Sequence, residues 1–379
     1  MTDVNVAASP TATLLADYLS AKQPRLEAVP YRGVLTPLEL DARLQEIEVL
    51  RSGCALHDLG WLRRVAVQGG DRFRWLSGMV TNMVKDLAPD AGAWNLVLNA
   101  QGRIQGDLMV WRQPPQQHGP VAGKSERDGD DLELEIEAFQ YEKILAHLNH
   151  FIIMDDVDLV PLEGDAAIGL TGANASRILT ALGLPALSDA PAQARAQWNG
   201  AQVLVRRGYG VLAEHYALWI AASQAGTLWE ALAAAGAKPV GAAALEAFRI
   251  AEGIPVYGVD IVDRDLPQET SQMHTLHFNK GCYLGQEIVE RIRSRGNVHR
   301  HLRSFELDGP LPSSGTKLTL EGAEAGHITS AAVLPLSGAT RVFALGVMRA
   351  EAEARNEPLN YEAEGTAGTA RFSASPPTL

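Results

Sequence analysis

The hydrophobic pattern of this 379-residue chain changes near residue 300, and the change restricts the folds that it can adopt. After His301 short alternating segments are separated by Gly and Pro. They are Ser304 to Leu307, Lys317 to Leu320, His327 to Val333, Val342 to Met348 and Leu359 to Glu362. Such segments are typical of a small antiparallel barrel. We therefore predict a C-terminal β-barrel that begins near residue 300.

The residues before the barrel mix helical and strand periodicity. Leu132 to Glu137 alternates strictly between apolar and acidic residues, as a half-exposed strand does. Two apolar segments flank Gln101-Gly102, which predicts a hairpin turning there. A similar order of strands and helices recurs after residue 160 and resembles split βαβ units. The sequence thus predicts an α+β fold of two ferredoxin-like lobes followed by the barrel.

The N-terminal region gives weaker signals. We interpret residues 1–30 as a flexible arm. A helix is expected next, capped by Thr36, with Pro37 in its first turn and Glu39 completing a capping box. Gly53 would end that helix. Residues 113–131 are rich in Pro, Gln, Gly and Asp and predict a surface loop.

Composition narrows the functional classes. The formal net charge is −12, which argues against general affinity for nucleic acid and requires an anionic ligand to be held locally. Cys54 and Cys282 are the two cysteines, too few for a disulfide framework. We see neither a secretory signal nor an apolar run that would span a bilayer. We expect a cytoplasmic protein, without membrane or nucleic-acid partners and monomeric.

Residues 279–287 concentrate an amine, a thiol, a phenol, an amide and a carboxylate around two glycines. A basic run follows, in which Arg291, Arg293 and Arg295 alternate, and on a strand they would share one face. A cation beside Cys282, here Lys280, would lower the pKa of its thiol and suit redox or covalent chemistry. His274 and His277 have the spacing of helical metal ligands but lack a third ligand, so we predict no metal site.

This segment contains the motif Lys280-Gly281-Cys282-Tyr283-x-Gly285-Gln286-Glu287. The motif resembles the signature of the YgfZ-type folate-binding proteins, which are relatives of the glycine-cleavage T-protein (aminomethyltransferase). Further stretches look like landmarks of the same superfamily, in the expected order: Thr81-Asn82, Asn99 to Arg103, Gly253-Ile254-Pro255, Gln268-Glu269 and His327 to Ser330.

The resemblance implies three domains in a cloverleaf ring, with tetrahydrofolate or a one-carbon derivative in the central hole. It divides the chain into a discontinuous first lobe (31–60 and 160–258), a second lobe (61–159), a connection (259–299) and the barrel (300–379). For the YgfZ branch it implies help in assembling or repairing iron–sulfur clusters, and hence iron–sulfur client or assembly proteins as partners.

Two positions depart from the transferase pattern. The aminomethyltransferases carry two adjacent acids, one of which works on the folate amine, whereas this chain has Gly106 followed by Asp107. We therefore expect Asp107 alone in that role and regard aminomethyl transfer as in doubt. Relatives also place a folate-binding Glu where this chain has Ala251. Glu252, one residue later, is a candidate for the same cofactor contact, although a one-residue shift on a helix turns the side chain by about 100°.

Chemical complementarity to folate selects further candidates. The donor-rich edge of a pterin needs carboxylate or amide partners, for which the candidates are Glu269, Gln286 and Glu287. The aryl portion suits an aromatic wall, for which Tyr257 and Tyr283 are candidates. The glutamate tail would seek arginine, and Arg291 and Arg293 are the nearest in sequence.

Four functions follow from these residues. We predict a tetrahydrofolate-binding accessory protein for iron–sulfur cluster assembly or repair, with Cys282, Lys280 and Asp107 as the working groups. The alternative is a folate-dependent aminomethyltransferase or a related one-carbon transferase, and the residues leave open whether any reaction is catalysed. A thiol hydrolase lacks an identifiable base or oxyanion loop, and an RNA-binding module conflicts with the acidic charge.

Overall fold

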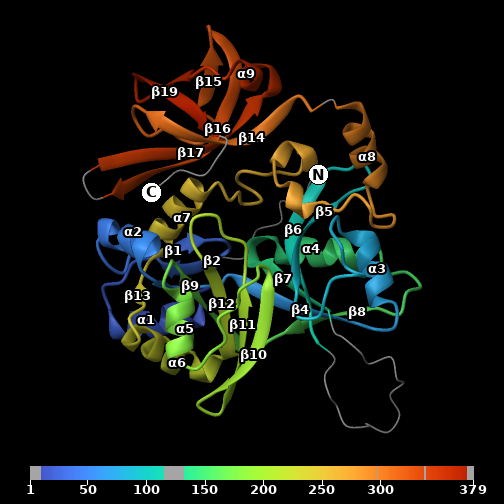
Figure 1. Ribbon diagram of the computed structural model, residues 1–379, viewed down its shortest axis with the longest axis vertical. Helices are drawn as coiled ribbons and strands as arrows, with labels where there is room; N and C mark the ends of the chain where they lie inside the picture. The colour runs from blue at the N-terminus through green and yellow to red at the C-terminus, as the bar shows by residue number, and fades with distance from the viewer. Residues whose placement is uncertain (1–9, 115–131, 297, 337–338, 374–379) are drawn as a thin grey trace, which may run out of the picture.

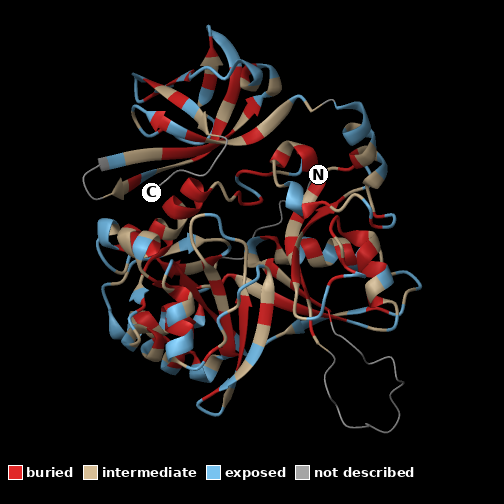
Figure 2. Cartoon of the chain, viewed as in Figure 1, coloured by how far each residue is buried: buried red, intermediate tan, exposed pale blue. Residues whose placement is uncertain are grey.

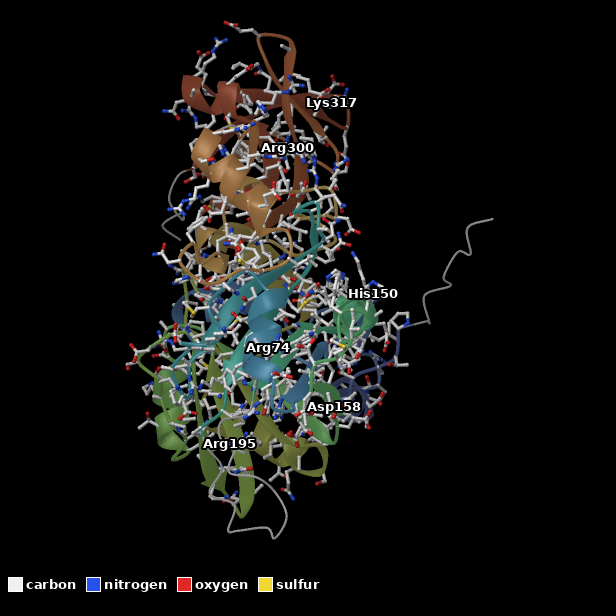
Figure 3. All side chains as sticks on the ribbon, turned by 90° about the vertical axis from the view of Figure 1, so that its right-hand side faces the viewer. Arg74, His150, Asp158, Arg195, Arg300 and Lys317 are labelled. Carbon is white, nitrogen blue, oxygen red and sulfur yellow. The ribbon has the colours of Figure 1, made fainter. Side chains whose placement is uncertain are left out.

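The computed structural model describes residues 10–114, 132–296, 298–336 and 339–373, which form two large sheets, a two-stranded sheet, a barrel and surrounding helices (Figure 1). The barrel lies at one end of the long axis. In the view turned by 90°, Lys317 on the barrel and Arg195 on the first sheet mark opposite ends of the molecule (Figure 3). The α+β class with a C-terminal barrel is therefore confirmed.

The first sheet has six strands in the order β10-β11-β12-β9-β3-β13. The strands are β3 (Ala55–Asp58), β9 (Asp165–Thr171), β10 (Ala192–Trp198), β11 (Ala201–Arg207), β12 (His215–Ala221) and β13 (Lys238–Pro239). Three helices contribute to its hydrophobic core, α1 (Leu14–Lys22), α5 (Ala175–Ala181) and α6 (Ala222–Ala234). Because β3 comes from before residue 60 and the other five strands from after 160, this sheet is built from two separate stretches of chain.

The second sheet has five strands in the order β5-β6-β7-β4-β8. They are β4 (Leu62–Gln68), β5 (Gly92–Leu98), β6 (Ile104–Arg112), β7 (Leu132–Glu137) and β8 (Asp158–Leu162). Helices α3 (Arg72–Met79) and α4 (Ala138–His150) share its core. The predicted hairpin is present, since β5 pairs with β6 across residues 99–103.

A buried ion network joins the two sheets. Arg206 of β11 exposes only 1% of its side chain, and its guanidinium lies 2.6 Å from Glu133 and 2.8 Å from Glu135 of β7. Arg64 of β4 bonds both Glu133 and Asp165. Removing one partner of such a buried pair typically costs about 3–5 kcal/mol. The network therefore fixes the two sheets against each other and with them the cavity described below.

The barrel closes in the order β14-β17-β16-β15-β18-β19. Its elements are β14 (Arg300–Asp308), β15 (Lys317–Leu320), β16 (Ala323–Leu336), β17 (Ala339–Arg349), α9 (Ala350–Arg355), β18 (Leu359–Ala363) and β19 (Thr366–Ser373). The predicted start near residue 300 is correct. Helices α2 (Arg43–Ser52) and α7 (Ala242–Glu252) pack beneath it, and buried residues run through α7 from the first sheet to the barrel (Figure 2).

Residues between α7 and the barrel form two short 3-10 helices, η1 (Pro267–Thr270) and η2 (Met273–Thr275), and the helix α8 (Gln286–Arg295). On the basis of these sheets we propose domain boundaries at 31–60 with 160–258, 61–159, 259–299 and 300–379. No helix among the described residues is long and apolar enough to cross a membrane.

Two predictions about the N-terminal region are wrong. Residues 14–31 contain α1 and β1 (Ala28–Tyr31), so the described part of the predicted arm is folded, while residues 1–9 lie outside the described residues. Thr36 does not cap a helix: it lies in β2 (Val34–Pro37) and its hydroxyl donates to Asp58 at 2.8 Å. Helix α2 begins only at Arg43. The predicted surface loop falls largely on residues 115–131, which are outside the described residues.

Candidate functional site

A cavity of about 250 Å³ lies between the two sheets. Its lining combines β6 and β7 of the second sheet, β11 and β12 of the first, and residues 254–257 after α7. Carboxylates of Asp107, Glu135 and Glu137 line it together with the guanidinium groups of Arg32 and Arg206. Cavities of this kind, with few polar groups converging between two domains, are the usual place for a small-molecule site.

Asp107 of β6 presents its carboxylate to this cavity with both oxygens held. Oδ1 accepts from Gln140 Nε2 at 2.7 Å and Oδ2 accepts from Trp94 Nε1 at 2.8 Å. Burial raises the pKa of Asp107, although both of these donors oppose the shift. A carboxylate so fixed, with its affinity for a proton raised, is suited to hold or accept a proton from a bound amine.

Gly106, where the transferases carry a second acid, points away from the cavity. Asp107 is among the residues that line the cavity, whereas Gly106 is not. An added Cβ at Gly106 would overlap Ile144 of α4 in the core of the second sheet. The missing acid therefore reflects close packing of α4, and its absence leaves the cavity-facing acid in place.

Three rings form an aromatic cluster beside Asp107, a feature that the sequence did not reveal. The ring centroids of Tyr209 and His274 are 4.7 Å apart. The Trp94 ring centroid lies 6.2 Å from that of Tyr209 and 5.3 Å from that of His274. Trp94 and Tyr209 line the cavity. The rings come from β5, the segment before β12 and η2, so no local pattern connects them. A flat ligand ring would find stacking partners here.

Glu252 belongs to a buried anchor near the cavity wall. Its side chain is fully buried, and its carboxylate accepts from the amides of Val211 and Leu212 and from His215 Nε2 at 2.9 Å. Burial alone would raise the pKa of Glu252, but His215 and the two amides outweigh it and lower the pKa. Glu252 thus holds the segment that carries Tyr209. The predicted contact between Glu252 and a cofactor is not available to a side chain so enclosed.

A chain of hydrogen bonds connects His57, Thr171, His215 and Glu252. Burial lowers the pKa of His57 to about 3, so His57 is neutral. Its Nδ1 faces the Asp58 carbonyl at 3.3 Å and must donate, so its Nε2 accepts from the Thr171 hydroxyl at 3.0 Å. That hydroxyl also lies 3.2 Å from His215 Nδ1, and His215 Nε2 lies 2.9 Å from the Glu252 carboxylate. The chain of hydrogen bonds therefore runs from β3 through β9 to Glu252 of α7.

Tyr257, predicted as part of an aromatic wall, lies on the rim of the cavity. Its ring stacks on Phe139 with centroids 6.2 Å apart. Its hydroxyl bonds Asp263 and receives a bond from Lys143, which also binds Asp263 at 2.8 Å. Lys143 of α4 and Asp263 of the connection thus hold the Tyr257 ring in place through its hydroxyl.

The motif segment lies outside the lining of this cavity, which contains no residue from 259–299 among the described residues. Lys280 is buried and donates to the carbonyls of Val80 and Asn82, each at 2.6 Å, and burial lowers its pKa to about 7. Its amine lies 5.2 Å from the ring of Tyr283, which is itself part of the core. Lys280 therefore attaches the segment to the end of α3.

The rest of the motif forms a turn that packs on the β5–β6 hairpin. An added Cβ at Gly285 would lie 2.6 Å from the Asn99 carbonyl, which explains a glycine at this contact. Gln286 Oε1 accepts from the Tyr283 amide at 3.2 Å. Cys282 and Glu287 are exposed, and Cys282 is a free thiol. The segment thus presents an exposed thiol on an anchored turn, at a site distinct from the cavity.

The predicted arginine strand is wrong. Residues 286–295 form the helix α8, in which residues two apart are turned by about 200°, so Arg291 and Arg293 do not share a face. Arg293 pairs with Glu290 at 3.4 Å and lies 4.3 Å over the ring of Phe278. The spacing of Glu290 and Arg293 is the helical signal that alternation concealed.

Glu269 is also committed elsewhere. Its carboxylate accepts from the Leu266 amide and pairs with Arg300 at 3.1 Å, at the start of the barrel. The Glu269 carboxylate therefore links the connection (residues 259–299) to the barrel, and it is not free to bind a pterin. No group of three or more His, Cys, Asp or Glu side chains that could hold a metal ion occurs within the described part of the chain.

Comparison with known proteins gives the family. Residues 31–280 match the GCVT N-terminal domain, and this chain belongs to that family. The aminomethyltransferase of Desulforamulus reducens is 25% identical over 320 residues, which cover 82% of this chain and 83% of that protein. The aminomethyltransferase of Rubrobacter xylanophilus is 26% identical over 343 residues, covering 88% and 86%.

The fold has a solved counterpart over nearly its whole length. The glycine cleavage system aminomethyltransferase T from Bartonella henselae superposes with a TM-score of 0.83, covers 97% of this chain and 98% of its own, and is 19% identical. The T-protein fold expected from the resemblance is thereby confirmed. Neither the comparisons nor this likeness single out the YgfZ branch.

Proposed function

We propose that this protein binds tetrahydrofolate or a one-carbon derivative in the Asp107 cavity and acts as a folate-dependent one-carbon transferase of the aminomethyltransferase type. The observation that carries the proposal is the carboxylate of Asp107, held at 2.7 Å and 2.8 Å by Gln140 and Trp94 on the wall of a cavity between two lobes. Relatives that align over more than four fifths of the chain are aminomethyltransferases, which supports it.

The cavity suits the parts of a folate that react. Trp94 and Tyr209 would offer ring faces to the pterin, and Asp107 would accept a proton from the folate amine that attacks the one-carbon unit. Glu137 on the same wall has its pKa raised by burial against the pull of Arg32, and adds a second oxygen acceptor for the pterin edge. These groups take the place of Glu269, Gln286 and Glu287, which the sequence suggested.

The test of this proposal is transfer of an aminomethyl group from a lipoylated carrier protein to tetrahydrofolate, with release of ammonia followed over time. Asp107→Asn keeps the size of the side chain but removes the proton acceptor and one of the two hydrogen bonds from Gln140 and Trp94, and should lower the rate by 10²-fold or more. Glu287→Gln, on the exposed motif turn, is the matched control and should be unaffected. No turnover by the unaltered protein, with folate bound, would exclude the transferase.

A second candidate function rests on a different observation, the exposed thiol of Cys282 on its anchored turn. A YgfZ-like accessory role in iron–sulfur cluster assembly would use this thiol together with the folate cavity. Cys282→Ser should then abolish support of iron–sulfur enzymes in cells that lack the endogenous protein, and leave folate binding intact. Full complementation by Cys282→Ser would remove this candidate.

A further inference from the structure

Gln140 of α4 makes a closed pair of hydrogen bonds with Asp107. Its Nε2 donates to Asp107 Oδ1 at 2.7 Å, and its Oε1 accepts from the backbone N–H of Asp107 at 3.1 Å. Gln140 is only 2% exposed, so water does not compete for either bond. Because one amide binds both the backbone and the carboxylate of the same residue, the carboxylate has little freedom to rotate.

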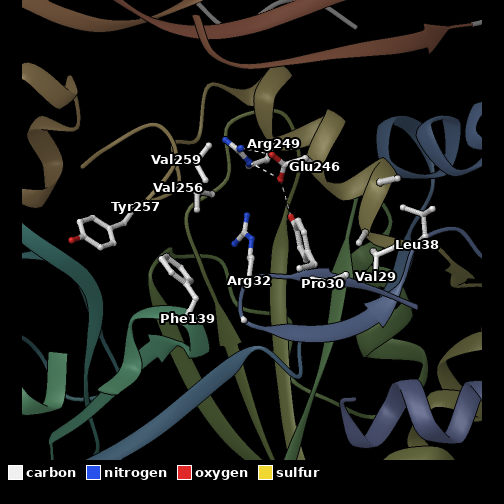
Figure 4. Close-up of a pocket in the computed structure, with 15 residues that line it drawn as sticks. Val29, Pro30, Arg32, Leu38, Phe139, Glu246, Arg249, Val256, Tyr257 and Val259 are labelled. Atoms are coloured by element: carbon white, nitrogen blue, oxygen red, sulfur yellow. Dashed lines mark hydrogen bonds and ion pairs between the residues drawn. The ribbon is translucent and has the colours of Figure 1, made fainter. Parts of the chain in front are cut away.

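The start of α4 directs this amide into the cavity. Phe139, the preceding residue, lies beside Arg32 and Tyr257 at the groove between the β1–β2 hairpin and α7 (Figure 4). Consecutive residues of a helix are turned by about 100° from each other. Gln140 therefore faces a different space from Phe139 and lines the Asp107 cavity.

Gly106 leaves the room that the Gln140 amide occupies. An added Cβ at Gly106 would lie 2.8 Å from Gln140 Oε1 and 2.2 Å from Ile144 Cδ1. A side chain at position 106 and the amide of Gln140 therefore exclude each other on this backbone. Where the aminomethyltransferases carry an additional acid, this chain has a glycine with a buried amide packed against it.

The amide also acts on the charge of Asp107. Burial raises the pKa of Asp107, and the hydrogen bond from Gln140 is the strongest of the influences that lower it. A donor to the ionised carboxylate stabilises the form that can accept a proton. Four further groups act on this carboxylate or are acted on by it, and they stay unchanged in the variants below: Trp94 of β5, Arg32 of the β1–β2 hairpin, Glu137 at the end of β7 and Tyr257 after α7.

We propose that Gln140 is the positioning residue of the Asp107 site: it aims the carboxylate into the cavity and keeps it ready to accept a proton, in a chain that lacks the second acid. This inference rests on the proposed function. Gln140 does not touch the reacting atoms and acts through Asp107, which is 33 residues away in sequence.

Carbon-13 NMR of the full chain, with labelled aspartate carboxyl groups, measures the ionisation of Asp107. The Asp107 signal is identified by its absence in Asp107→Asn. Gln140→Met keeps the size of the side chain and removes the amide. We expect the titration midpoint of Asp107 to move to higher pH by about one unit, the effect of losing one hydrogen bond to a charged acceptor. Asn149→Met, the same kind of change at an exposed position of α4, is the matched control and should not move it.

Kinetics with saturating tetrahydrofolate and the lipoylated carrier protein separate positioning from binding. Gln140→Met should lower kcat about tenfold, because a misplaced carboxylate slows proton transfer. The acidic limb of its pH–rate profile should move to higher pH together with the midpoint. The Kd for tetrahydrofolate, measured by calorimetry, should stay within about threefold of that of the unaltered protein. A purely structural role would lower stability and leave the position of the acidic limb unchanged.

A second variant displaces the amide without replacing it, and it decides the question if Gln140→Met fails to fold. Ile144→Val removes the Cδ1 atom nearest to Gly106 and serves as the background. Adding Gly106→Ala then presses on Gln140 Oε1. The double variant should reproduce the higher midpoint of Asp107, whereas Ile144→Val alone should not.

The outcomes distinguish the inference from the function on which it rests. An unchanged midpoint in Gln140→Met and in the double variant overturns the inference, and so does a higher midpoint with an unaltered rate. Weaker folate binding without a shift of the midpoint would make Gln140 a ligand contact and also overturns it. If the unaltered protein transfers no aminomethyl group, the proposed function fails, and the titration alone decides whether Gln140 holds the Asp107 carboxylate.

Discussion

Replacing Glu252 by Ala separates an anchoring role from ligand binding. The change removes a fully buried carboxylate that accepts from two backbone amides and from Nε2 of His215. Three hydrogen bonds to a charged acceptor, at about 1.5 kcal/mol each at the low end, sum to about 4–5 kcal/mol. We expect the free energy of unfolding to fall by about 4 kcal/mol.

The assay is urea unfolding followed by tryptophan fluorescence, with Glu290→Ala as the matched control. Glu290 pairs with Arg293 on a half-exposed helix face at 3.4 Å, so its loss should cost less than about 1 kcal/mol. The pKa of Glu252 is lowered by folding, so its contribution is fully present above the unfolded pKa near 4.5. The difference between the two proteins should therefore stay constant from neutral pH down to about 5 and shrink as the pH falls further.

An opposite result would refute this reasoning. If Glu252→Ala is as stable as the unaltered protein but no longer binds folate, Glu252 is a ligand contact in spite of its one-residue offset from the family position, and the anchor described here is wrong. If stability and folate affinity both fall, Glu252→Gln distinguishes the two causes. The amide retains an acceptor for the Leu212 and Val211 amides, so it should recover part of the stability and most of the affinity.

Three other predictions follow from the motif segment and the ion network. Burial lowers the pKa of Lys280 to about 7 from 10.5, so unfolding takes up a proton between these values and the free energy of unfolding should rise with pH there. In urea titrations at pH 7–10, Lys280→Met should abolish this rise, and an unchanged rise would contradict the prediction. Cys282 is exposed whereas burial raises the pKa of Cys54 to about 12, so mass spectrometry should find Cys282 alkylated first, and Cys282→Ser should change the unfolding free energy by less than about 0.5 kcal/mol. Arg206→Ala should cost about 3–5 kcal/mol in chemical denaturation, because Glu133 and Glu135 lose their shared partner, and a loss below about 1 kcal/mol would show that the network does not join the sheets.

The barrel and the lobes could be predicted because their signals are local. Alternation in segments such as Leu132 to Glu137 is repeated along the chain, and each strand carries its own pattern. The helix α8 was not predicted because three alternating arginines match a strand. The single pair Glu290 and Arg293, three residues apart, is the only opposing helical signal that we identify there. Thr36 has the spacing of a capping box but pairs in β2, where tertiary contacts with Asp58 outweigh the local preference.

The cavity could be predicted only in part. Asp107 was recognisable by resemblance and Tyr257 by its suitability for the aryl part of a folate. Trp94, Tyr209 and His274 instead come together from segments that are far apart in sequence. The sequence does carry a local signal at Arg32. Arg32-Gly33 lies between Tyr31 and Val34, and a pair that ends in Gly between two apolar residues is typical of a two-residue hairpin turn. What that turn faces depends on packing against Phe139, and no sequence pattern contains this information.

The most direct test of the central claim is a crystal structure of the protein soaked with 5-formyltetrahydrofolate. The account predicts the pterin in the cavity between the sheets, within hydrogen-bonding distance of the Asp107 carboxylate and against the rings of Trp94 and Tyr209. Electron density for the ligand along α8 or at the Cys282 turn, with the Asp107 cavity filled only by water, would contradict it.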